Sequence, residues 1–91
     1  MEFITNPTTV NDYRNQGYIE YAWLFDNGFG LVYKDVLGEP LDYVFAVEHD
    51  GEGNYTYSDI GTHFMSPTDV IIMDVMTPEK IDEYVEVISN W

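Results

Sequence analysis

The sequence predicts an α+β fold, in which a single antiparallel sheet of four to five strands is combined with a short N-terminal helix and a C-terminal helix. Two aromatic and β-branched runs flank the tripeptide at residues 26–28, a pattern typical of a β-hairpin. Near the C-terminus, apolar residues recur at helical spacing. We expect one domain, residues 1–91, because the chain is short and 45% of its residues are hydrophobic.

The first segment is expected to form a short helix that begins at Asn6 and ends at Gly17. Asn6 can serve as the N-cap, Pro7 suits the first helical position, and Gly17 can terminate the helix. Val10 and Tyr13 would then cover one edge of the sheet.

The hairpin of residues 18–33 is the element around which the rest of the sheet is expected to form. Its Asn27-Gly28 pair can take the positive φ angles of a type I′ turn. Side chains alternate along the first arm, so one of its faces is strongly apolar and should carry the core. The side chains of that face are Ile19, Tyr21, Trp23 and Phe25.

Three further strands are expected after the hairpin. Residues 41–48 are rich in β-branched and aromatic residues, which favours a third strand, and residues 55–58 pair back as a fourth after a turn at residues 49–54. Residues 60–68 are expected to form a loop. The apolar run at residues 70–73 fits either a fifth strand or a buried helical turn, and we favour the strand.

The C-terminal helix is expected to span residues 78–90. Thr77 can cap it, and Pro78 suits its first position. Its apolar face is formed by Ile81, Tyr84, Val85 and Ile88.

The charge of the chain is strongly negative and uneven. Seventeen acidic residues stand against three basic ones, which gives a net charge of −14. Residues 1–34 hold four acids and two bases, whereas residues 35–91 hold thirteen acids and one base. Such a surface repels nucleic acids and membranes, and it attracts basic proteins. We therefore expect a basic partner, no direct contact with nucleic acid and no membrane association.

Two groups of carboxylates are candidates for binding such a partner. One lies along the outer stripe of the C-terminal helix, at spacings i, i+3, i+4 and i+7, and the other follows the third strand and its turn. A solvated acidic face is the alternative interpretation for each group alone. The candidate residues are Asp42, Glu48, Asp50, Glu52, Asp59, Glu79, Asp82, Glu83 and Glu86.

The second group also resembles a calcium-binding loop of the EF-hand kind in its spacing. Glu48, Asp50, Glu52, Gly53 and Asp59 fall at positions that such a loop uses. That motif needs flanking helices, whereas the flanking residues here are predicted to be strands. We therefore favour a plain acidic turn and expect no metal and no cofactor.

No pattern of catalytic residues stands out. His49 and His63 are the only histidines, and without cysteine they form no zinc or nucleophile motif. No glycine loop for phosphate is present, because Gly28 and Gly30 flank the hairpin turn. We expect a protein that is not an enzyme.

Aromatic residues are abundant for so small a core, with eight tyrosines and two tryptophans. Tyrosine gives a large contact area at a low entropy cost, so some of these side chains can lie at an interface, such as that of a homodimer. The alternative is that they fill the second face of the sheet.

Small size, lack of cysteine, strong acidity and many aromatic residues together resemble the phage-encoded DNA-mimic inhibitors. Among these, the chain is similar to the Arn anti-restriction proteins of T-even phages. The resemblance covers the whole chain in size, charge and predicted layout, and it rests on no motif beyond the nine candidate carboxylates. It implies a protein in the cytoplasm of a bacterial host, acting as a dimer, that occupies the DNA-binding surface of a restriction nuclease. An anti-CRISPR protein or another inhibitor of a DNA-binding enzyme fits the same residues.

Overall fold

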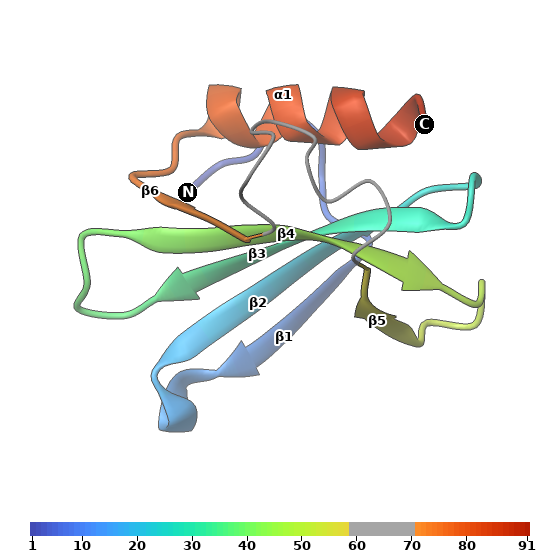
Figure 1. Ribbon diagram of the computed structural model, residues 1–91. Helices are drawn as coiled ribbons and strands as arrows, with labels where there is room; N and C mark the ends of the chain where they lie inside the picture. The colour runs from blue at the N-terminus through green and yellow to red at the C-terminus, as the bar shows by residue number, and fades with distance from the viewer. Residues whose placement is uncertain (59–70) are drawn as a thin grey trace.

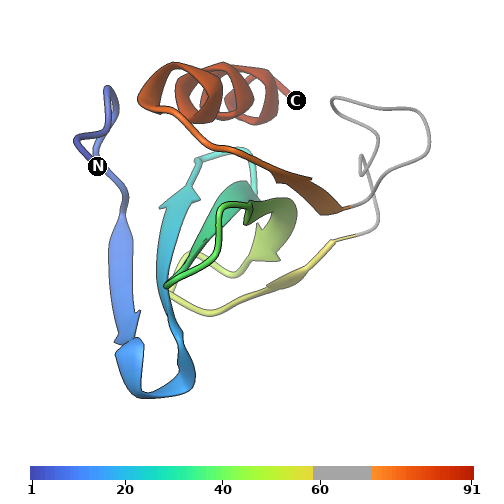
Figure 2. The same ribbon diagram turned by 90° about the vertical axis from the view of Figure 1, so that its left-hand side faces the viewer.

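A computed structural model describes residues 1–58 and 71–91 of the chain. In it, one helix lies across one face of a curled antiparallel sheet (Figure 1), and Figure 2 shows the same arrangement from the side. The elements in chain order are β1 (Thr9–Tyr13), the 3₁₀-helix η1 (Arg14–Gln16), β2 (Tyr18–Leu24), β3 (Phe29–Val36), β4 (Asp42–His49), β5 (Tyr55–Tyr57), β6 (Ile71–Asp74) and α1 (Pro78–Ser89).

Within the described residues the sheet has six strands, and all the pairings between them are antiparallel. Its order is β1-β2-β3-β4-β5, with β6 also paired to β4. The predicted α+β class, the antiparallel sheet and the C-terminal helix are therefore confirmed. The sheet has one or two strands more than predicted, because the first segment of the chain contributes a strand as well.

The N-terminal helix predicted from Asn6 to Gly17 is wrong, because residues 9–13 form strand β1 and no α-helix occurs in residues 1–58. β1 pairs with β2 along its whole length, and Thr8 extends the pairing by donating its amide to the Ala22 carbonyl at 2.7 Å. Capping residues act over one turn only, whereas pairing with a strand already in the sheet satisfies five residues at once. Within residues 6–17 only η1 is helical, and Gly17 ends it with a φ of 95°.

The central hairpin forms as predicted, but its turn is of another type. Trp23 pairs with Leu31, and the Phe25 amide donates to the Phe29 carbonyl across a three-residue loop. The Gly28 amide donates to the Phe25 carbonyl, and Gly28 alone in the loop has a positive φ, of 86°. This is a turn of the type I class followed by a left-handed glycine, the usual solution for a three-residue loop. A type I′ turn would need a positive φ at Asn27 as well.

The main core lies between the sheet and α1. The predicted apolar face of β2 carries it, and Trp23 at its centre is 1% exposed. The buried residues of this core are Trp23, Leu31, Tyr33, Val44 and Ala46 from the sheet, with Met76, Ile81, Tyr84, Val85 and Ile88 from the helix and the segment before it. All four residues predicted for the apolar face of the helix are among them.

The opposite face of the sheet is partly closed by the curl of the sheet itself. Tyr55 on β5 donates its hydroxyl to the Glu20 carboxylate on β2 at 2.6 Å, and the side-chain amide of Asn11 on β1 donates to that hydroxyl at 3.1 Å. This bridge joins strands from the two ends of the sheet, β1 and β2 on one side and β5 on the other. A second, smaller cluster of buried side chains lies beneath this bridge, formed by Ala22, Val32 and Val47.

β5 and β6 lie end to end along the same edge of β4. The Ser58 amide donates to the Ala46 carbonyl at 3.1 Å, and Ile71 pairs with Phe45, the preceding residue of β4. The fifth predicted strand is thus confirmed at residues 71–74. The loop predicted for residues 60–68 lies outside the described residues.

The predicted C-terminal helix is confirmed as α1. Thr77 caps it by accepting a hydrogen bond from the Lys80 amide at 3.2 Å, and Pro78 occupies its first turn. It ends at Ser89, one residue before the predicted end. Within the part of the chain that the structure describes, no helix is long and apolar enough to cross a membrane.

Candidate partner-binding surface

The outer face of α1 presents the predicted row of carboxylates. Glu79, Glu83 and Glu86 are exposed, while Ile81, Tyr84, Val85 and Ile88 are buried on the opposite face. Asp82 is partly buried and accepts a hydrogen bond from the Thr5 hydroxyl at 2.9 Å. We call Glu79, Asp82, Glu83 and Glu86 the α1 stripe. Helical periodicity alone brings these four residues together.

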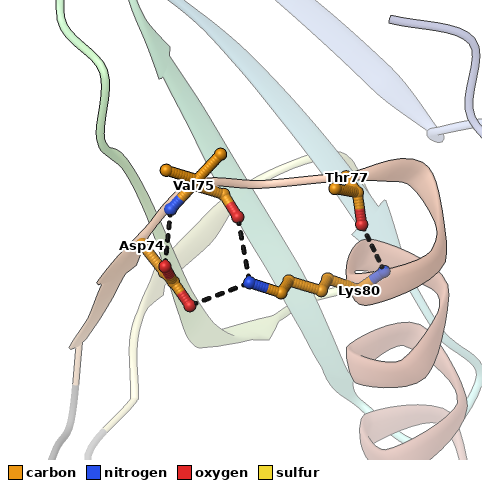
Figure 3. A network of polar contacts seen from close by, with 4 residues as sticks. All are labelled: Asp74, Val75, Thr77 and Lys80. Carbon is orange, nitrogen blue, oxygen red and sulfur yellow. Dashed lines mark hydrogen bonds and ion pairs between the residues drawn. The ribbon is translucent and has the colours of Figure 1, made fainter.

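The one basic residue of α1 does not neutralise this stripe. The Lys80 ammonium group donates to the Asp74 carboxylate at 3.0 Å and to the Val75 carbonyl at 3.2 Å (Figure 3). Its hydrogen bond holds the pKa of Asp74 below its usual value. The sequence places Lys80 on the same helix as the stripe, but its contact with Asp74 depends on how β6 meets the helix. Among the described residues, the four carboxylates of the α1 stripe have no basic partner.

Asp42, the first candidate of the strand group, is used within the fold. Its two carboxylate oxygens accept hydrogen bonds from the Tyr33 hydroxyl at 2.8 Å and from the Val36 amide at 3.0 Å. Burial, followed by this hydrogen bond, raises the pKa of Tyr33. Burial also raises the pKa of Asp35, and the Asp42 charge adds to that effect. The Asp42 carboxylate thus joins the β3–β4 connection to the sheet.

Asp50 organises the turn between β4 and β5. Its carboxylate accepts hydrogen bonds from the Glu52 amide at 2.8 Å, the Asn54 amide at 3.3 Å and the Asn54 side chain at 2.9 Å. The bond from the Asn54 side chain is the largest cause that lowers the pKa of Asp50. Glu48 and Glu52 are exposed. Asp50 is exposed too, but its carboxylate is engaged within the turn, so Glu48 and Glu52 are the described carboxylates of the strand group that remain available to a partner.

His49 fixes the same turn against the neighbouring hairpin. Its Nδ1 atom accepts from the Gly51 amide at 3.1 Å, so the ring proton lies on Nε2, which donates to the Phe25 carbonyl. The sequence gives no sign of this contact, because Phe25 is 24 residues away from His49 in the chain. The structure assigns it a role in joining two turns.

The nine predicted residues do not form one cluster. The α1 stripe lies on the helix, and the β4–β5 turn lies at an end of the sheet (Figure 1). Asp59 and His63 lie outside the described residues. Strands flank the β4–β5 turn, in contrast to the helices of an EF-hand. In the described ranges, no group of three or more acidic or histidine side chains is arranged to hold a metal ion.

The surface is therefore an arrangement of carboxylates, and the described residues, 1–58 and 71–91, contain no group of side chains that could hold a metal ion. What it can do chemically is accept hydrogen bonds from cationic side chains, since ionised carboxylates are acceptors only. Compared with protein-family models, with curated proteins and with solved structures, the chain gives no match.

Proposed function

We propose that this protein is a DNA-mimic inhibitor, which occupies the DNA-binding surface of a host defence nuclease such as a restriction enzyme. The observation that carries the proposal is the α1 stripe, four carboxylates that no basic side chain of the described chain neutralises. Like charges at neighbouring positions of a helix destabilise it. Keeping them unpaired is costly for the fold and useful to a surface that binds cations.

The charge density of the α1 stripe supports the proposal. From Glu79 to Glu86 the helix rises about 10 Å, at about 1.5 Å per residue. Duplex DNA carries one charge per ~1.7 Å of axis, so roughly six charges fall within the same length. The α1 stripe offers four, and it lies on a rigid helix. Glu48 and Glu52 add a second, smaller group on the β4–β5 turn.

The partner that fits this surface is a basic, DNA-binding protein. Arginine and lysine side chains that contact phosphates make charge-assisted hydrogen bonds, and carboxylates can accept the same bonds. A restriction nuclease and a CRISPR effector both offer such side chains, so an anti-CRISPR role is the alternative within this proposal. In either role the protein acts in the cytoplasm of a bacterial host, as an inhibitor without a cofactor.

The test compares two variants that lose the same number of charges. In the first, Glu79, Glu83 and Glu86 are replaced by Gln, which leaves the Asp82 bond to Thr5 in place. In the second, Glu2→Gln, Asp26→Asn and Glu39→Gln remove three exposed charges elsewhere. The affinity of the helix variant for the target nuclease is expected to fall at least tenfold. This loss corresponds to a binding free energy on the order of that of one charge-assisted hydrogen bond. The control variant should bind nearly as tightly as the natural chain.

The measurement is inhibition of plasmid cleavage by a panel of restriction nucleases and CRISPR effectors, with duplex DNA as competitor and salt varied. Circular dichroism checks that both variants are folded. A DNA mimic gives inhibition that weakens with salt and is relieved by excess DNA. An equal loss of inhibition in both variants would show that the net charge of the chain, and not the α1 stripe, determines binding. Full inhibition by the helix variant, with no competition by DNA, would refute the proposal.

A further inference from the structure

A cavity of about 330 Å³ opens on the face of the sheet that points away from α1. Side chains from four strands, β2, β3, β4 and β6, form it, and its apolar and aromatic walls surround one charged group. Its lining residues are Tyr18, Lys34, Val36, Tyr43, Phe45 and Ile71. The α1 stripe is on the other side of the sheet, so the cavity and the proposed nuclease-binding surface are separate.

Lys34 is unusual among the basic residues of the chain. Arg14 pairs with Asp12 at 3.2 Å, and Lys80 pairs with Asp74 at 3.0 Å. Lys34, by contrast, has no carboxylate within ion-pair distance in the described residues. Its ammonium group lies 4.9 Å from the centre of the Tyr18 ring and 5.7 Å from that of Phe45. These cation–π contacts hold the charge at the cavity without neutralising it.

The acid best placed to neutralise Lys34 is bound elsewhere. Glu20 stands directly opposite Lys34 in the pairing of β2 with β3. Its carboxylate accepts the Tyr55 hydroxyl at 2.6 Å and lies 3.5 Å from the side-chain amide of Asn11. The bridge that closes the other half of this face therefore takes the Glu20 charge away from Lys34. A positive charge is left among apolar side chains, in a chain of net charge −14.

We infer that this cavity is a binding site for a small apolar carboxylate, a molecule with one flat hydrophobic body of one or two rings and one carboxylate group. The rings of Tyr18 and Phe45, with Ile71, suit the hydrophobic body, and Lys34 supplies the counter-charge. The hydroxyls of Tyr18 and Tyr43 make no hydrogen bond within the described chain, so both can donate to the carboxylate. The volume lies at the lower end of the range for small-molecule sites, which excludes bulky ligands.

The test uses 2-naphthoate as the probe, titrated into isotopically labelled protein and followed by amide chemical shifts. Shifts are expected at the six lining residues and not along α1. The neutral isostere 2-naphthamide has the same shape without the charge, and it should bind at least about tenfold more weakly, because it loses a charge-assisted contact with Lys34.

Two variants separate the Lys34 charge from the charge of the whole chain. Lys34→Gln should reduce the affinity for 2-naphthoate about tenfold and leave that for 2-naphthamide nearly unchanged. Arg14→Gln removes one positive charge outside the cavity, and it should leave both affinities unchanged. Equal binding of the two probes, an equal loss in the two variants, or no saturable shift at the lining residues would overturn the inference. Inhibition of a nuclease by Lys34→Gln is expected to be intact, so the two proposals fail independently.

Discussion

Among the described residues, Trp23 is the largest fully buried side chain of the core between the sheet and α1. It is 1% exposed, and its indole N–H donates to the Thr5 carbonyl at 2.8 Å. The Phe3 ring packs edge-on against it, with 5.0 Å between the ring centroids. The side chain therefore fills the core and also ties the N-terminal residues to the sheet.

Replacing Trp23 by Ala is expected to lower the free energy of unfolding by about 3–5 kcal/mol, because the cavity left beneath α1 cannot collapse fully. Urea denaturation followed by circular dichroism measures the change. Trp23→Phe keeps most of the ring volume and should cost clearly less. A loss below 1 kcal/mol for Trp23→Ala would show that the residue is not central to the core.

Asp35 is a residue whose charge opposes folding. Burial and the neighbouring Asp42 raise the pKa of its carboxyl, so the folded chain disfavours the ionised form. Asp35→Asn should therefore increase the free energy of unfolding at pH 7. The gain should shrink as the pH falls towards the carboxyl pKa, where the natural residue becomes neutral too.

Urea denaturation of Asp35→Asn at pH 7 and at pH 4 checks both statements. Glu39→Gln is the matched control, since Glu39 is exposed and carries the same charge. A gain of equal size in both variants would indicate an effect of net charge alone, in conflict with the local cause.

Among the elements, those with signals confined to a few neighbouring residues were predictable from the sequence. The cap and proline at Thr77-Pro78 and the spacing of the apolar residues define α1, and the two runs around Gly28 define the hairpin. The N-terminal segment has equally good local signals at Asn6 and Pro7. It nevertheless pairs with β2, because pairing along a whole strand stabilises the segment more than a helix cap would.

The same distinction applies to the candidate site. Helix periodicity was sufficient to predict the α1 stripe. It was not sufficient to show that Asp42 is bound by Tyr33, or that Lys80 reaches back to Asp74, because those contacts depend on how separate elements meet. The Lys34 cavity combines four strands, and no short stretch of sequence contains it.

Tyr55 connects the two ends of the sheet, and its hydrogen bond to Glu20 makes this connection sensitive to alkali. Burial, followed by that hydrogen bond, raises the pKa of Tyr55 from 10.0 to about 12. The protonated form is thus favoured by folding. Its stabilising contribution is complete below pH 10 and is lost as the pH rises towards 12.

Tyr55→Phe is expected to cost about 1 kcal/mol at pH 8, the usual net value of one hydrogen bond. The difference from the natural chain should disappear as the pH rises towards 12. Urea denaturation across this range measures it. Tyr57→Phe is the control, because the Tyr57 hydroxyl makes no hydrogen bond in the described part of the chain. A pH-independent difference for Tyr55→Phe would contradict the role given to its hydroxyl.

At the scale of the whole molecule, the net charge of −14 acts against the fold. The longest dimension is 33 Å. At 0.01 M salt the screening length is about 30 Å, so nearly every carboxylate is repelled by every other, whereas at 0.15 M it is about 8 Å and only neighbours interact.

Raising NaCl from 0.01 M to 0.15 M is therefore expected to increase the melting temperature by several degrees, about 4–8 °C for each kcal/mol of relieved repulsion. Thermal unfolding followed by circular dichroism measures it. The two triple variants of the proposed-function test carry fewer charges and should respond less. A melting temperature independent of salt would mean that the acids are too widely spaced to repel one another in the folded state.

The arrangement of β5 and β6 has a consequence for how the length of the chain can vary. Ser58 and Ile71 lie opposite the consecutive residues Ala46 and Phe45, so the chain leaves the edge of β4 and returns to it one residue further along. For a flexible loop the entropy cost of closure grows only with the logarithm of its length, so each doubling costs roughly 0.6 kcal/mol. Each of the two strands has its own pairing with β4, which sets its register: Tyr57 pairs with Val47, and Ile71 pairs with Phe45. This edge is thus a position where the protein can acquire or exchange sequence without rebuilding its sheet.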